Sequence, residues 1–280
     1  MNKYISIFFC VQIIALNLFA MQPKVTPVDY VRPQIDTHKS RWFFFSSASR
    51  PFGMVSLSPD TWTEGSWNSG YLYNSKEIRC FSHVHCWQLA GVPVMPTTGE
   101  VKGHKGMDAY KSTYSHETEI VKPGYHKVEL DTYQIRVELT STSRVGMHRY
   151  TYPAGEKANV LFDVGALLAH GKTEKAAIHR ISSKEIGGYS VLAPTSRRKK
   201  PVTVYFVARF NQNMTAFGGW EKEGKEKKLV HKNSIEGADI GGYASFGKLK
   251  KQTLLMKVGI SYVSEEQARI NLEKELAHWN

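Results

Sequence analysis

The chain of 280 residues is long enough for one large domain or two small ones, and its 41% hydrophobic and 22% charged residues exclude a disordered protein. Its 37 Lys and Arg against 25 Asp and Glu give a net charge of +12, which raises nucleic acid or an anionic surface as partners. The basic residues are spread along the chain without a nucleic-acid-binding module, so we expect no nucleic-acid partner. The two basic runs, 197–200 and 222–232, are interpreted as solvated loops, with acidic glycans or anionic cell surfaces as the alternative.

Residues 1–20 are predicted to be a signal peptide. Lys3 supplies the positive start, and the apolar run 5–14 is too short to span a bilayer. We therefore expect an exported protein, located in the periplasm, at the cell surface or secreted, with no membrane span. Beyond the signal only Cys80 and Cys86 remain, which is no disulfide framework.

The stretch 51–99 places aromatic and polar residues between frequent glycines and prolines, a composition typical of loops that carry a site. Aromatic rings offer flat apolar faces and the polar groups offer directional hydrogen bonds, and a sugar ring uses both. The alternative is that the tryptophans belong to the core and the histidines are satisfied buried polar groups. The residues concerned are Asp60, Trp62, Glu64, Trp67, Tyr71, Tyr73, His83, His85 and Trp87.

Short strands are expected within this stretch at 52–57, 70–73 and 78–81, after an aromatic strand at 42–45. His83 and His85 are separated by one residue, so in a strand they point to the same face, for joint substrate contact or joint burial. A lone His-x-His is a weak metal signal, and we assign no metal ligand here.

Residues 101–110 are predicted to be a loop. The chain after them is predicted to form a series of strands. Period-two alternation at a spacing near ten residues predicts a mainly β fold, an antiparallel β-sandwich. In 124–130 the expected apolar face holds Tyr125, Val128 and Leu130, against His126 and Glu129. The expected strands are 114–120, 124–130, 135–141, 145–152, 159–164, 177–181, 185–193, 202–210, 243–246 and 254–261.

The only convincing helix begins after Ser264, which with Gln267 forms a capping box. Its apolar face is expected to have nothing left in the chain to continue into. The residues of that face are Ile270, Leu272, Leu276 and Trp279.

Signatures of common enzyme classes are absent from the sequence, including a phosphate-binding loop, paired zinc cysteines and a nucleophile elbow. Asp60 with Glu64, or Asp163, is a possible acid and base pair for glycoside cleavage, with turn and cap residues as the alternative. No catalytic residue is assigned.

Four motifs in order, PFGMVSLSPDT, SGYLY, FSHVHCW and VPVMPTTGE, resemble the amino-terminal domain of family 92 glycoside hydrolases, the bacterial calcium-dependent exo-α-mannosidases that act on N-glycans. The resemblance continues through GYHKVEL and NVLFDVGA to LLMKVGISYVSEEQARINLEKEL, and so covers nearly everything after the signal.

The resemblance implies a β-sandwich of the galactose-mutarotase/glycosidase type, packed against a larger (α/α)6 domain across the active-site cleft. The expected divisions are the signal 1–20, the sandwich 25–262, and at 263–280 the start of a linker helix to an absent helical domain. The general acid, the general base and the calcium ligands belong mainly to that helical domain, so all are expected outside this chain.

By the same resemblance, substrate-binding roles fall to Trp67, Asp60, Ser69, Gly70, His83, His85 and Trp87. The sequence after His85 departs from many family members, which leaves the linkage preference open. The expected function is the substrate-cleft domain of an exported α-mannosidase that binds mannose-containing glycans and is not catalytic without a helical partner domain. The alternatives are a stand-alone carbohydrate-binding module and a basic adhesion protein.

Overall fold

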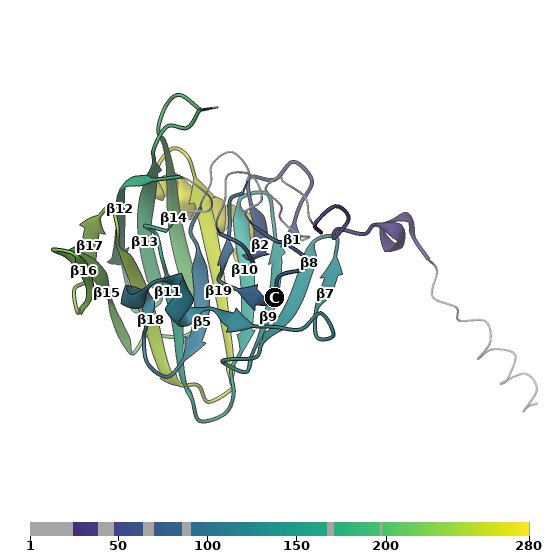
Figure 1. Cartoon of the computed structure of the whole chain (residues 1–280), viewed down its shortest axis with the longest axis horizontal. Helices are drawn as coiled ribbons and strands as arrows, with labels where there is room; N and C mark the ends of the chain where they lie inside the picture. The colour runs from purple at the N-terminus through teal and green to yellow at the C-terminus, as the bar shows by residue number, and fades with distance from the viewer. Residues whose placement is uncertain are drawn as a thin grey trace, which may run out of the picture. The chain divides into compact units, whose positions relative to one another are not determined.

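The computed structural model describes residues 25–38, 48–63, 70–85, 91–166, 171–196 and 198–279 (Figure 1). The chain divides into two units, Met1–Val31 and Arg32–Asn280. The first contains the 3-10 helix η1 (Pro27–Tyr30), where the backbone N–H of Thr26 donates to Asp29 Oδ2 at 2.7 Å. The expected signal at 1–20 and the aromatic strand at 42–45 lie outside the described residues. Over the ranges that are described, no helix is long and apolar enough to cross a membrane.

The second unit is built from two large antiparallel sheets, as the alternating sequence predicts (Figure 1). One sheet has the order β1 (Ala48–Ser49), β2 (Ser56–Asp60), β4 (Cys80–Ser82), β5 (Val94–Thr98), β11 (Lys157–Phe162), β18 (Gly241–Lys248), β15 (Ala216–Glu223) and β16 (Glu226–Val230). Among the described residues this sheet has eight strands, and we call it the eight-stranded sheet.

The second, nine-stranded sheet begins with β17 (Ser234–Gly237), β12 (Thr173–Arg180), β13 (Glu185–Leu192) and β14 (Val202–Phe210). It continues with β19 (Thr253–Ser261), β10 (Val145–Thr151), β9 (Ile135–Ser141), β8 (Tyr125–Leu130) and β7 (Ile120–Lys122). A small pair joins β3 (Glu77–Ile78) to β6 (Ser112–Thr113). The helices of this unit are η2 (Gly103–Lys105), α2 (Met107–Tyr110) and α3 (Glu265–Glu275).

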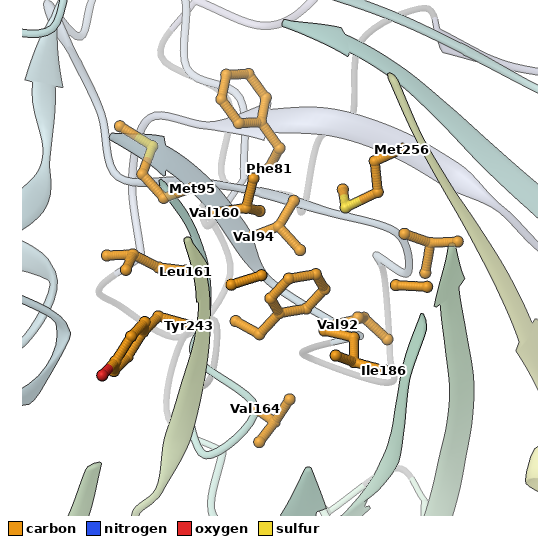
Figure 2. Packing of buried hydrophobic residues seen from close by; sticks show 14 of the residues in the cluster. Phe81, Val92, Val94, Met95, Val160, Leu161, Val164, Ile186, Tyr243 and Met256 are labelled. Carbon is orange, nitrogen blue, oxygen red and sulfur yellow. The ribbon is translucent and has the colours of Figure 1, made fainter. Parts of the chain in front are cut away.

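The main hydrophobic core contains residues of both sheets, which confirms the predicted antiparallel β-sandwich (Figure 2). Phe162 of β11 stacks on Phe206 of β14 with ring centroids 6.1 Å apart, so an aromatic contact joins the two sheets. In β9 the alternation places Ile135, Val137 and Leu139 inside, as residues of a strand with one buried face must be.

Several local predictions were wrong. The face of β8 that is buried consists of His126, Val128 and Leu130, so His126 is inside and Tyr125 is half-buried on the opposite face. The expected strand 114–120 is a turn segment between β6 and β7, and the expected loop 101–110 contains η2 and α2. The lysine-rich run 222–232 is largely a hairpin of β15 and β16, because its alternating charges suit two exposed strands.

The predicted strand 52–57 also begins later than expected. Residues 50–53 form a turn closed by the bond from the Gly53 N–H to the Arg50 carbonyl at 2.9 Å. Phe52 has φ +59° in that turn and is fully exposed, so it cannot belong to a buried strand. Strand β2 starts at Ser56 instead.

Helix α3 begins as predicted, because Ser264 Oγ accepts the Gln267 N–H at 3.0 Å. Part of its apolar face packs on the sheet, through Leu272 and Leu276. Ala268 and Leu272 are buried against Val145 and Val207, on the outer face of the nine-stranded sheet. The helix lies so close to β19 that a Cβ on Gly259 would be 2.4 Å from the Ala268 carbonyl oxygen.

We expect Leu272→Ala to lower the free energy of unfolding by about 2–4 kcal/mol, because it leaves a cavity between α3 and the sheet. Ile270→Ala removes a similar side chain from a half-buried position of the same helix and should cost about 1 kcal/mol or less. Urea denaturation of both variants measures the difference. Equal losses would show that α3 is not anchored through Leu272.

Candidate functional site

The residues that flank two segments of the predicted site, 64–69 and 86–90, are joined by backbone hydrogen bonds; we call these flanking residues the loop bases. Trp62 and Gly70 form an isolated antiparallel bridge, which closes the base of the segment 64–69. The His83 N–H donates to the Gly91 carbonyl at 2.8 Å and closes the base of the segment that contains 86–90. The predicted site residues Trp67, Ser69 and Trp87 fall in these two segments and lie outside the described residues, as does Glu64.

Asp60 and His85 join the bases of the two loops. Asp60 ends β2, two residues before the Trp62 bridge, and His85 is the last described residue before 86–90. His85 Nε2 lies 2.6 Å from Asp60 Oδ1, and both side chains are fully buried. The other carboxylate oxygen accepts the Ser82 hydroxyl at 2.5 Å and the Cys80 thiol at 3.2 Å.

The hydrogen-bond pattern indicates a buried ion pair. His85 Nδ1 donates to the Ser56 carbonyl at 2.7 Å, so both ring nitrogens of His85 face acceptors. One further proton must lie between Nε2 and Oδ1. The Asp60 carboxylate also accepts from Ser82 and Cys80, so all of these partners are donors, and we assign the remaining proton to His85.

Cys80 and Asp163 are buried groups whose proton affinity is set by their surroundings. Burial, followed by the charge of Asp60, raises the pKa of the Cys80 thiol well above its usual value, so the sulfur is no nucleophile. Burial also raises the pKa of Asp163 to about 6. Asp163 accepts the Tyr110 hydroxyl at 2.7 Å. Its possible acid or base role stays a prediction.

His83 belongs to a separate buried chain that crosses between the sheets. His83 Nδ1 donates to the Val92 carbonyl at 2.8 Å, and its Nε2 lies 2.8 Å from His148 Nε2 on β10. His148 Nδ1 in turn lies 2.9 Å from the Tyr150 hydroxyl. Burial lowers the pKa of both imidazoles, that of His83 to about 4. With both rings neutral, Tyr150 donates to His148, which donates to His83, so every polar atom is satisfied.

A third buried cluster, around Glu119, was not found from the sequence. Glu119 accepts the Tyr71 hydroxyl at 2.9 Å and the N–H of His116 Nδ1 at 2.6 Å, and His126 Nε2 lies 3.0 Å from Glu119 Oε1. Burial alone would raise the pKa of Glu119, but the bonds from His126, His116 and Tyr71 outweigh it and lower the pKa. Tyr71 follows Gly70, so this cluster fixes the outgoing side of the first loop. The feature of the sequence that could have indicated this cluster is His126, which occupies a position of β8 whose side chain faces the interior.

The described site residues therefore support the loops. Asp60, His83 and His85 are buried with their polar atoms engaged, which is the joint-burial alternative for the two histidines. Gly70, also buried, has φ +106°, a backbone conformation that glycine adopts readily, and its N–H and carbonyl both bond to Trp62. Direct contact of these residues with a sugar stays a prediction.

The described residues offer no fit for the calcium ion that the resemblance implies. Within the ranges covered by the structure, no three His, Cys, Asp or Glu side chains are grouped so that they could hold a metal ion. We derive no step through calcium.

The two antiparallel sheets, with a helix on one outer face, define the class of the domain as an antiparallel β-sandwich. The profile of the Glycosyl hydrolase family 92 N-terminal domain matches residues 30–261. The chain therefore belongs to glycosyl hydrolase family 92, within its N-terminal domain. A comparison with curated proteins gave no match.

Solved structures agree with this family. The GH92 alpha-mannosidase BT3965 from Bacteroides thetaiotaomicron has 28% identity and a TM-score of 0.79, over 91% of this chain and 36% of that one. The same enzyme in complex with mannoimidazole gives a TM-score of 0.76 at 28% identity, over 88% and 34%. The GH92 inverting mannosidase BT2199 from B. thetaiotaomicron VPI-5482 shares the fold at 22% identity, with a TM-score of 0.76, over 92% and 34%. The chain thus spans 34–36% of the length of these proteins.

We expect Asp60→Asn to lower the free energy of unfolding by about 3–5 kcal/mol, because it leaves His85 buried without its counter-charge. Asp108→Asn is the matched control, since Asp108 pairs with Arg79 and Lys111 but its side chain is 72% exposed. Its effect should stay within about 1 kcal/mol. Chemical denaturation at neutral pH measures both, and a mild Asp60→Asn effect would contradict the buried ion pair.

The His83 chain predicts acid sensitivity. The folded pKa of about 4 lies below the ordinary value of 6.5, so the unfolded chain binds more protons between these values. The stabilisation is complete above pH 6.5 and is lost as the pH falls toward 4, by about 3 kcal/mol from His83. Unfolding free energies across this range should show the slope. His83→Gln should flatten it, and His278→Gln, at an exposed position, should not.

Proposed function

We propose that this chain forms the substrate-cleft side of an exported α-mannosidase that acts on mannose-containing N-glycans. The support is family membership together with two 28% identical structures of an alpha-mannosidase, one of them with mannoimidazole. The observation that carries the proposal is the Asp60–His85 ion pair. It joins described residues near the segments 64–69 and 86–90, which contain Trp67, Ser69 and Trp87. The predicted signal at 1–20 is the basis for export.

The role of the described residues in such an enzyme is to position the loops. Asp60, His85 and Ser82 hold one loop base against the other, while Glu119 holds Tyr71 on the opposite side of the first loop. Trp67 and Trp87 would supply the aromatic rings that meet the sugar, and holding the flanking residues in place lowers the entropy lost on binding. Inverting glycoside hydrolysis also requires a carboxylic acid and a carboxylate base flanking the bond. We assign these two groups, and the calcium site, to a helical partner domain.

The proposal predicts that the purified chain alone releases no mannose from α-mannosides, because a positioned sugar without an acid and a base is not cleaved. Mannose release from mannobiose and from a high-mannose glycan measures this. Release by the chain alone would refute the assignment of the acid and base to another domain.

A matched binding measurement separates the proposed half-cleft from a stand-alone carbohydrate-binding module. Calorimetry with mannobiose should give the same titration for the parent chain and for Trp67→Ala, because half a cleft binds weakly. A strong heat signal that Trp67→Ala abolishes would favour the binding module instead.

A further inference from the structure

A groove of about 450 Å³ lies on the outer face of the nine-stranded sheet, beside the end of α3. Its floor comes from neighbouring strands β9, β10 and β19, which lie side by side in Figure 1. Met147 pairs with Thr140 on one side, and Arg149 pairs with Glu138 on one side and Leu255 on the other. Tyr125 of β8 and Trp279 also line the groove, so it carries two aromatic side chains.

The polar part of the floor is a neutralised charge pair. Arg149 Nε donates to Glu138 Oε2 at 2.7 Å, Arg149 Nη2 donates to Oε1 at 2.5 Å, and Tyr125 donates to Oε1 at 2.7 Å. The bond from Arg149 is the main cause that lowers the pKa of Glu138, so the pair is charged at neutral pH. The Arg149 side chain remains 53% exposed and that of Glu138 15% exposed, so the pair meets the groove mainly through Arg149.

The aromatic wall is held in place from below. Lys257 is buried and donates to the carbonyls of Leu276 and His278, at 2.7 Å each. Its ammonium also lies 4.1 Å from the centre of the Trp279 ring. The segment that carries Trp279 is therefore tied to β19 by two charge-assisted hydrogen bonds and a cation–π contact. A ligand would meet a pre-positioned ring.

We propose that this groove is a second carbohydrate site, which binds a neutral oligosaccharide of pyranose rings. The Trp279 and Tyr125 rings stack on the C–H faces of the sugar, and the Arg149–Glu138 pair donates to and accepts from its hydroxyls. The groove is formed by strands and residues other than those of the two loops of the proposed cleft. Its volume lies within the range of ordinary small-ligand sites.

The charge pattern favours a neutral sugar over the other classes of ligand. An anion would find the Arg149 charge already neutralised by two bonds to Glu138. An apolar polypeptide segment would bury the same ion pair away from water, which is unfavourable unless new hydrogen bonds replace those to water. A sugar supplies such bonds through its hydroxyls and still covers Met147 and Leu255.

The test is an NMR titration of the full chain with mannotriose and with maltotriose, following the Trp indole N–H signals. The Trp279 signal, assigned by its loss in Trp279→Ala, should shift saturably with at least one sugar. Trp279→Ala and Arg149→Ala should each weaken binding at least about tenfold, as loss of a central aromatic or Arg contact does. No shift of the Trp279 signal with either sugar would overturn the proposal.

Two controls keep the result specific. Arg136→Ala removes an exposed Arg that pairs with Glu129 on the same sheet, outside the groove, and should leave affinity within about twofold. Trp67→Ala should leave the Trp279 shift unchanged, whether or not the proposed cleft function is right. If Trp67→Ala abolished the shift, or Trp279→Ala bound like the parent, the groove would not be the site. Melting temperatures confirm that each variant is folded.

Discussion

The buried Asp60–His85 ion pair is the contact on which the arrangement of the candidate site depends. It links Asp60 at the end of β2 to His85, three residues after the end of β4, and each partner keeps further hydrogen bonds to Ser82, Cys80 or Ser56. A buried pair of this kind need not add much net stability over an apolar pair of the same size. It instead favours one arrangement of the two loop bases, because any other arrangement would leave a buried charge without a partner.

The fold was predictable from the sequence because apolar and polar residues alternate along its strands. A strand with one buried face repeats every two residues, so β9, β14 and β19 were placed to within one residue at each end. The start of α3 was predictable for a similar reason, because its capping box joins Ser264 to Gln267, only three residues away. The mistake at β8 has a clear cause. His126 was counted as polar and therefore exposed, whereas Glu119 gives it a buried partner.

The candidate site was predictable only in part, because its hydrogen bonds join residues far apart in the chain. The family motifs pointed to Asp60 and His85, but their mutual contact spans 25 positions. The His83–His148 contact spans 65, and the Tyr71–Glu119 bond spans 48. No local pattern specifies such pairs, since each is set by strand register across or between sheets. His116 and Glu119 lie in a turn segment that alternation had assigned to a strand.

The two faces of the sandwich use polar residues in different ways, and the difference separates support from recognition. Near the loop bases the ionisable groups are buried and their hydrogen bonds are complete, so they hold backbone in place and have little capacity left for a ligand. On the outer face of the nine-stranded sheet, Arg149 is paired with Glu138, and the Arg149 side chain is still 53% exposed. Because the pair is neutral as a whole and lies beside Tyr125 and Trp279, the exposed part of Arg149 can exchange water for sugar hydroxyls without a change in protonation. The surface that sequence motifs left unassigned is therefore the one whose described residues are best suited to bind a ligand directly.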